Sequence, residues 1–169
     1  MVIWIIGLSG AGKTSLARSV YLLAKSKGIK NLVHLDGDRM REIYSNDLGH
    51  DLNSRRINSY RIEKICKLLD EQNIHVLCSI LSIFPEAREW CRENFSSFYE
   101  VFIDAPISAL IARDSKGIYS SKLDNNLAGI DITFPTPVNP DLIIYNKSDL
   151  DALLSYQSQI CELIIASQW

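Results

Sequence analysis

Short apolar runs alternate along the chain with longer segments in which apolar residues recur every three or four positions. The short runs predict five β-strands, at Val2–Ile6, Asn31–Asp36, Ile74–Ile80, Tyr99–Asp104 and Leu142–Tyr145. Strands that alternate with helices are joined by crossover connections, which produce parallel sheets covered by helices. The pattern therefore predicts an α/β fold with a mainly parallel five-stranded sheet and helices on both faces.

Helices are predicted from local signals in three of the longer segments: Lys13–Lys27, Ser54–Asn73 and Asp149–Ser167. Gly28 closes the first helix, because glycine readily takes the left-handed conformation that ends many helices. Ser54 is the predicted N-cap of the second helix. The buried stripe of that helix is predicted to consist of Ile62, Ile65, Cys66 and Leu69.

The segment 114–139 is a long polar excursion that contains glycines and prolines and is framed by Arg113, Lys116 and Lys122. Long loops in compact domains are commonly functional lids. We therefore predict a mobile lid over a phosphate site. No repeat or linker divides the chain, so residues 1–169 are expected to form a single domain.

Composition limits the partners of this fold. Hydrophobic residues make up 47% of the 169 residues and charged residues 22%, as in folded globular proteins. The net charge of −2 gives no overall attraction to nucleic acid polymers or anionic membranes, which favours a small phosphorylated ligand. The N-terminus lacks the features of a signal peptide, and no apolar run approaches the roughly 20 residues that cross a bilayer. We therefore predict a cytoplasmic protein without membrane contacts.

One glycine-rich motif carries the strongest chemical signal. Residues 7–14 match the phosphate-binding loop pattern G-x-x-x-x-G-K-[ST] and stand between an apolar strand and a helix. Glycines let backbone N–H groups turn toward phosphate oxygens, and the helix N-terminus adds positive potential. Lys13 is predicted to reach the β and γ phosphates, and Thr14 to offer its hydroxyl to Mg²⁺. The predicted ATP-binding residues of this loop are Gly10, Ala11, Gly12, Lys13, Thr14 and Ser15.

A second pattern leaves a GTP-binding switch open as an alternative. Asn146-Lys147-Ser148-Asp149 resembles the N-K-x-D signature that reads guanine, and Asp114-Ser115-Lys116-Gly117 imitates the D-x-x-G magnesium motif. The D-x-x-G-like stretch lies at the start of the polar lid, whereas in a GTPase this motif lies at the end of a strand much earlier in the chain. The simpler interpretation of the first pattern is that Ser148 or Asp149 caps the last helix.

Two carboxylates follow the second predicted strand, in Leu35-Asp36-Gly37-Asp38. The carboxyl ends of the strands form the edge at which open α/β sheets bind ligands. A carboxylate at this edge can orient an acceptor hydroxyl and take its proton, or hold the water ligands of Mg²⁺. The alternative for Asp36 is that it caps the short helix that follows.

Taken in order, these motifs resemble the adenylylsulfate kinase family over nearly the whole chain. The matching pieces are Gly7-Leu8-Ser9-Gly10, Leu35-Asp36-Gly37-Asp38, Arg41, Asp47-Leu48-Gly49, Arg55 with Asn58, Ser82, Arg113–Tyr119, Gly129-Ile130-Asp131 and Asn139-Pro140. The resemblance implies a P-loop kinase fold, transfer of the γ-phosphoryl group from MgATP to a ribose 3′-hydroxyl, and often a homodimer. The predicted acceptor is therefore a small nucleotide.

The same resemblance implies roles for single residues. Asp38 takes the position of the general base or hydroxyl-orienting group and forms, with Lys13, the predicted catalytic pair. Arg113 and Lys116 take positions that close on ATP. The predicted acceptor-binding residues are Asp36, Arg41, His50, Arg55, Asn58, Leu81, Ser82 and Leu127. Arg55 and Asn58 are three apart on one predicted helix and so share a face, which suits an acidic group.

Two positions depart from the family pattern. Family members typically clamp adenine between an aromatic residue after D-L-G and another before the T-G-I-D stretch of the lid, and this chain has His50 and Leu127 there. The lid is also shorter, and Ile83 replaces a proline. Loss of the clamp leaves a pyrimidine nucleotide open as the acceptor. The resemblance offers cytidine diphosphoramidate, used in capsule biosynthesis, and a kinase for a small metabolite is a further alternative.

Overall fold

The computed structural model describes residues 1–114, 117–120, 126–147 and 149–167. Its centre is a five-stranded sheet with the strand order β2-β3-β1-β4-β5, in which every neighbouring pair is parallel. The strands are β1 (Val2–Ile6), β2 (Leu32–Asp36), β3 (His75–Ile80), β4 (Phe98–Asp104) and β5 (Leu142–Tyr145). The predicted α/β fold and all five predicted strands are confirmed.

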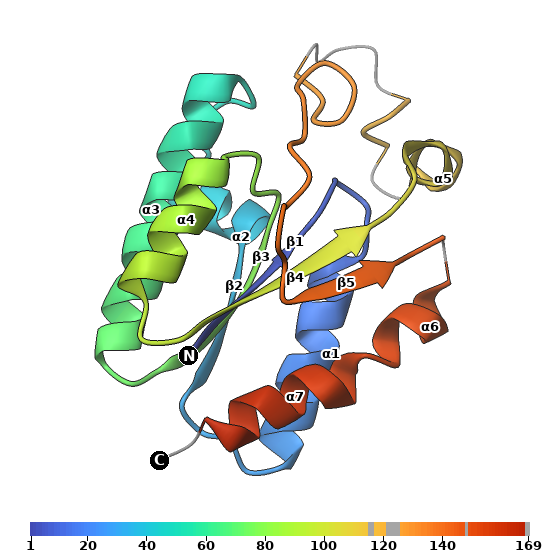
Figure 1. Cartoon of the computed structure of the whole chain (residues 1–169). Helices are drawn as coiled ribbons and strands as arrows, with labels where there is room; N and C mark the ends of the chain where they lie inside the picture. The colour runs from blue at the N-terminus through green and yellow to red at the C-terminus, as the bar shows by residue number, and fades with distance from the viewer. Residues whose placement is uncertain (115–116, 121–125, 148, 168–169) are drawn as a thin grey trace.

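Helices cover both faces of the sheet (Figure 1). One face carries α1 (Lys13–Ser26), α6 (Leu150–Leu154) and α7 (Gln157–Ala166). The other face carries α3 (Leu52–Glu71) and α4 (Pro85–Asn94). Two short helices follow the carboxyl ends of β2 and β4, namely α2 (Gly37–Ile43) and α5 (Ile107–Arg113).

Strand β1 shows why the sheet needs both helical layers. Successive side chains of a strand point to opposite faces. Ile3 and Ile5 pack in the cluster that contains α1 and α7, whereas Val2, Trp4 and Ile6 pack in the cluster that contains α3 and α4. All five side chains are at most 1% exposed. Full burial of such a side chain contributes roughly 1.5–3 kcal/mol, so this central strand anchors the core.

Two helix predictions are wrong in detail. The N-cap of α3 is Asp51, whose carboxylate accepts hydrogen bonds from the N–H and the hydroxyl of Ser54. Ser54 therefore lies inside the helix rather than at its cap. The predicted helix Asp149–Ser167 is two helices, α6 and α7. At the break, the hydroxyl of Ser155 donates to the carbonyl of Ala152, a local bond that competes with the helical ladder.

The described residues contain neither a disulfide nor a membrane-spanning helix nor a cluster of metal ligands. All four cysteines are buried and form no disulfide there. Within the same residues, no helix combines the length and apolar character needed to cross a membrane. Nor do three or more His, Cys, Asp or Glu side chains gather into a metal-binding group in that part of the chain.

The winding of the chain opens a crevice at one edge of the sheet. After β1 the chain enters α1 on one face, and after the neighbouring strand β3 it enters α4 on the other (Figure 1). Neighbouring strands whose helices leave to opposite faces separate at their carboxyl ends, which is where open α/β sheets bind ligands. The candidate site lies in this crevice.

Candidate functional site

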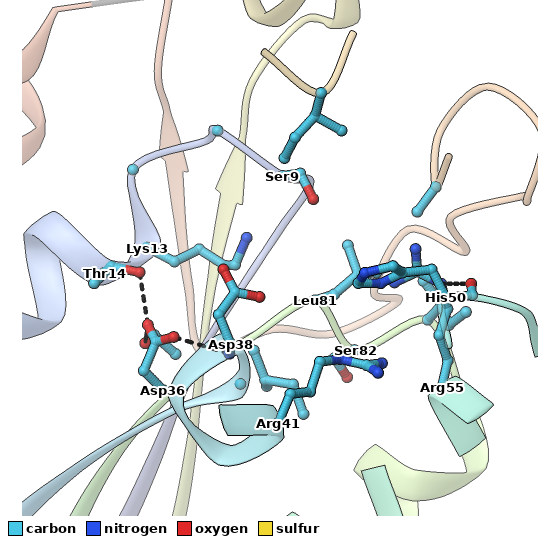
Figure 2. Close-up of a pocket in the computed structure, with 18 of the residues that line it drawn as sticks. Ser9, Lys13, Thr14, Asp36, Asp38, Arg41, His50, Arg55, Leu81 and Ser82 are labelled. Atoms are coloured by element: carbon cyan, nitrogen blue, oxygen red, sulfur yellow. Dashed lines mark hydrogen bonds between the residues drawn. The ribbon is translucent and has the colours of Figure 1, made fainter. Parts of the chain in front are cut away.

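A cavity of about 640 Å³ lies at the carboxyl edge of the sheet. The predicted site residues that line it are Gly10, Gly12, Lys13, Thr14, Ser15, Asp36, Asp38, Arg41, His50, Arg55, Asn58, Leu81, Ser82, Arg113 and Leu127. Ala11 is fully buried within the loop, and Lys116 lies outside the described residues. Parts of the predicted lid, 115–116 and 121–125, also lie outside them. The fold thus brings distant segments to one space (Figure 2).

The phosphate loop between β1 and α1 approaches its neighbours too closely for larger residues. A Cβ atom at Gly7 would lie 2.6 Å from the carbonyl oxygen of Ile103. Gly12 has a φ of 102°, and a Cβ atom there would lie 2.4 Å from Cδ2 of Leu153. Helix α1 then starts without a side-chain cap and without an acidic residue in its first turn. Its first N–H groups can therefore bind an anion.

Lys13 and Asp38 reach the same part of the cavity from different elements. The Nζ atom of Lys13 donates to the carbonyl of Leu8 at 2.8 Å, which holds the ammonium group over the loop. Asp38 lies in the first turn of α2, and Figure 2 shows its carboxylate pointing toward the space that Lys13 enters. A cation beside the phosphates and a carboxylate across from them suit a phosphate donor and a hydroxyl acceptor.

Hydrogen-bond donors surround the carboxylate of Asp36. Its Oδ2 atom accepts the hydroxyls of Thr14 at 2.7 Å and Ser79 at 2.6 Å. Its Oδ1 atom accepts the N–H groups of Asp38 at 3.0 Å and Arg39 at 3.4 Å, which makes Asp36 the N-cap of α2. The capping interpretation is confirmed. Because Thr14 gives its hydroxyl proton to Asp36, its oxygen lone pairs are available to a cation.

A chain of hydrogen bonds supports Asp36 from inside the sheet. Burial by itself would raise the pKa of the Asp36 carboxyl, but bonds from Ser79, Thr14 and two N–H groups outweigh it and hold that pKa below its ordinary value. The Nε2 atom of His34 lies 3.0 Å from Oγ of Ser79. Since Ser79 gives its proton to Asp36, Nε2 of His34 is the donor. Burial lowers the pKa of His34, although the charge of Asp36 opposes this.

Two residues in the acceptor half of the cavity each carry a buried side-chain oxygen without a hydrogen-bond partner in the described part of the chain. The two atoms are Oδ1 of Asn58 and Oγ of Ser82. The two residues line the cavity and are 6% and 4% exposed. Ser82 also has a φ of 53°, which is strained for a residue other than glycine. Buried polar atoms almost always have partners, so these atoms mark positions where a ligand would supply them.

Arg41 and Arg55 stabilise the loop that joins α2 to α3. Nη1 of Arg41 donates to the two carbonyls of Leu48–Gly49 at 3.2 and 2.8 Å. Arg55 donates from Nε to the carbonyl of His50 at 2.6 Å and from Nη2 to the carbonyl of Asn126 at 2.9 Å. A guanidinium group has five N–H donors. Both arginines therefore order this loop while bringing positive charge to the cavity.

Sequence reasoning missed Ser79, Tyr119 and Asn126. The register of the sheet places Ser79 beside Asp36, and a polar residue near the end of an apolar strand was the available signal. The hydroxyl of Tyr119 donates to the carbonyl of Ser9 at 2.8 Å, which ties the start of the lid to the phosphate loop. Tyr119 and Asn126 act through loop geometry, for which the sequence carries no local signal.

Two residues of the N-K-x-D pattern, Asn146 and Asp149, have structural roles. The side-chain amide of Asn146 is buried and donates to the carbonyl of Ala11 at 2.9 Å. The carboxylate of Asp149 accepts the N–H of Ala152 at 2.9 Å and caps α6. Ser148 lies outside the described residues. The capping interpretation of Asp149 is therefore confirmed.

The comparison with protein families gives a match at the sequence level. The family model described as adenylylsulphate kinase matches residues 1–145. The chain belongs to the adenylylsulfate kinase family. Adenylylsulfate kinases are P-loop kinases, so the predicted fold class and the predicted ATP-dependent kinase activity are confirmed. This membership replaces the GTP-switch alternative.

Two relatives of this adenylylsulfate kinase family member are named for different substrates. A cytidine diphosphoramidate kinase of Campylobacter jejuni is 37% identical over 152 residues, which cover 86% of each chain. An adenylyl-sulfate kinase of Halothermothrix orenii is 36% identical over 168 residues, which cover 97% of this chain and 89% of the relative. The structure of the Mycobacterium tuberculosis APS kinase CysC, in complex with AMPPNP and APS, aligns with a TM-score of 0.84 at 29% identity and covers 97% of this chain and 96% of that one.

Proposed function

We propose that this kinase transfers the γ-phosphoryl group of MgATP to the ribose 3′-hydroxyl of a small nucleotide. The observation that carries the proposal is that one cavity has the phosphate loop at one end and, at the other, Asn58 and Ser82, whose side-chain oxygens have no hydrogen-bond partner among the described residues. The hydroxyls and phosphates of a nucleotide supply the partners that such a wall needs. Relatives named for adenylylsulfate and cytidine diphosphoramidate support a nucleotide acceptor.

On the donor side, the loop N–H groups and Lys13 bind the β and γ phosphates of ATP. Thr14 is the residue that would hold Mg²⁺, because its hydroxyl proton is directed to Asp36 and its lone pairs are left for a cation. Mg²⁺ neutralises phosphate charge when it is bound. Arg113, at the end of α5, brings a further cation to the cavity. The proposed ATP-binding role of Lys116 stays a prediction.

On the acceptor side, Asp38 takes the proton of the 3′-hydroxyl while the hydroxyl oxygen forms a bond to the γ phosphorus. The bond from the γ phosphorus to the bridging oxygen of ADP breaks in the same transfer, and the proton ends on the carboxylate. Ser82 and Asn58 orient the acceptor. Arg41 and Arg55 attract its acidic tail.

We expect the Asp36→Ala variant to need more Mg²⁺ for its half-maximal rate, because Thr14 loses the acceptor that orients its hydroxyl. The same change removes the N-cap of α2 and should lower the free energy of unfolding by about 1–2 kcal/mol. A Mg²⁺ titration of the rate and a urea denaturation curve measure the two effects. Ser79→Ala is the matched control, since it removes one donor to Asp36 but leaves the cap and Thr14 in place. Unchanged Mg²⁺ dependence in Asp36→Ala would count against the role of Thr14.

A pyrimidine nucleotide is the second candidate acceptor. His50 and Leu127 line the cavity at the positions where the family typically has its aromatic clamp. Stacking of a base on an aromatic side chain is worth about 1–3 kcal/mol, so loss of the clamp should weaken adenine binding. The name of the Campylobacter jejuni relative supports a cytidine diphosphate derivative.

The test of both proposals is a comparison of kcat/KM for adenylylsulfate and for cytidine and uridine diphosphate derivatives at saturating MgATP. We expect the pyrimidine acceptors to react at least as efficiently as adenylylsulfate. For the best acceptor, the 3′-deoxy analogue should not react, and the 2′-deoxy analogue is the matched control. A strong preference for adenylylsulfate would exclude the pyrimidine proposal. Phosphorylation of the 3′-deoxy analogue would exclude the 3′-hydroxyl.

A homodimer also stays a prediction. Several large apolar side chains on α2 and α3 are exposed, namely Ile43, Leu52, Tyr60 and Leu68. Pairing of two chains through these helices would cover them.

A further inference from the structure

A buried arginine, Arg88 of α4, joins three segments behind the acceptor wall. Its Nη1 atom donates to the carbonyl of Ser82 at 2.8 Å. Its Nη2 atom donates to the carbonyl of Pro135 at 3.4 Å, in the returning arm of the lid. Its Nε atom lies 3.1 Å from Oε1 of Glu100 on β4. Arg88 is only 6% exposed, and it is not among the described residues that line the cavity.

The bond to Ser82 is made at the strained residue. Ser82 has a φ of 53°, and residues other than glycine keep such a conformation only where their surroundings hold it. Its hydroxyl oxygen is buried and has no hydrogen-bond partner in the described chain, while its carbonyl accepts a hydrogen bond from the guanidinium group. Hydrogen bonds from a charged donor are stronger than neutral ones. The side chain that fixes Ser82 is therefore Arg88.

Stability alone does not explain the network of charges around Arg88. Glu100 pairs with Arg88 and with Nη2 of Arg92 at 2.6 Å, and Nη1 of Arg92 lies 3.2 Å from Asp141. Removing charges from water costs free energy, and apolar replacements of similar volume are often as stable as a buried ion pair. Such a network is better explained by the geometry that it imposes.

The same guanidinium group also reaches the root of the lid. Pro135 follows Phe134, whose ring stacks on Phe102 of β4 with 5.9 Å between the ring centres. The nearby carbonyl of Asn139 accepts a bond from Arg92 at 3.0 Å. The acceptor wall and the returning arm of the lid are thus fastened to the same helix.

We propose that Arg88 is a positioning residue that sets the affinity for the acceptor. It holds Ser82 in its left-handed conformation at the acceptor wall, and it ties this wall to the root of the lid. The inference rests on the proposed function, in which Ser82 contacts the acceptor.

The experiment measures the KM of the acceptor, the KM of ATP and the melting temperature for Ser82→Ala, Arg88→Lys and the double variant. Lysine keeps the charge but cannot reach three partners with a planar fork. Each single variant should raise the KM of the acceptor about tenfold and leave the KM of ATP unchanged. The KM of the acceptor in the double variant should be no higher than in the more strongly affected single variant. Lys67→Arg is the control, because Nζ of Lys67 donates to the carbonyl of Asn94 at 2.7 Å at the other end of α4, and it should change the KM of the acceptor less than about twofold.

Several outcomes would overturn the inference. If Arg88→Lys lowers the melting temperature and raises both KM values alike, or if its effect adds fully to that of Ser82→Ala, Arg88 is only structural. In that case the proposed function stands. If Ser82→Ala leaves the KM of the acceptor unchanged, the assumed contact fails, and the inference fails with it. Should Arg88→Lys not fold, Glu100→Gln weakens the hold on the same guanidinium group and must give the same selective rise.

Discussion

The Lys13→Ala variant is expected to lose phosphoryl transfer while keeping its fold. A hydrogen bond to a charged group contributes roughly 1.5–3 kcal/mol, and each 1.4 kcal/mol is about tenfold in rate. The loss should therefore be at least tens-fold, and larger where the bond strengthens in the transition state. The fold should persist because Lys13 lines the cavity and is not part of the buried core. Acceptor-dependent ADP release and thermal denaturation measure the two properties.

Lys25→Ala is the matched control for Lys13→Ala. Lys25 lies on the same helix, its Nζ atom donates to the carbonyl of Lys30 at 2.8 Å, and it does not line the cavity. Its removal should leave turnover unchanged. Near wild-type turnover in a folded Lys13→Ala protein would contradict the assignment of the phosphate loop.

The Asp38→Asn variant is expected to lower kcat by roughly 10²–10⁴-fold with little change in the KM of ATP. Asparagine keeps the size and the hydrogen-bonding reach of the side chain but cannot take a proton. The effect should therefore fall on the acceptor hydroxyl rather than on nucleotide binding. Steady-state kinetics with each substrate varied in turn separate the two parameters.

Asp47→Asn serves as the comparison for Asp38→Asn. Asp47 pairs with Arg61 at 2.7 Å and does not line the cavity. Replacing its carboxylate with an amide should therefore leave kcat unchanged. If Asp38→Asn instead raised the KM of ATP at unchanged kcat, Asp38 would belong to the donor site.

The strands were readable from the sequence because buried parallel strands are continuous apolar runs, as in Val2–Ile6. Helix α4 was not predicted, since it is rich in charged residues and its apolar face is narrow. On this helix Arg88 is buried and pairs with Glu100, which is also buried, on the following strand β4. A charged residue gives no sign in the sequence that it will be buried.

The site was readable where its chemistry is local. The phosphate loop is a contiguous motif, and the close contacts that its glycines indicate are present in the structure. The distinction between Asp36 and Asp38 was not readable, because it depends on hydroxyls of Thr14 and Ser79, which are 22 and 43 residues away from Asp36. The general lesson is that the sequence marks which groups are present, whereas their hydrogen-bond partners come from the fold.

Helix α6 has a consequence for the boundaries of the working enzyme. Leu153 packs against Gly12, where a Cβ atom would lie 2.4 Å from its Cδ2 atom, and Leu150 and Leu153 line the cavity. The match to the family ends at residue 145, before this helix begins. The segment that the family model matches is therefore smaller than the unit that builds the cavity, although the Halothermothrix orenii relative aligns over 97% of this chain. A protein cut after β5 would retain every recognisable motif and yet lack the wall behind its phosphate loop.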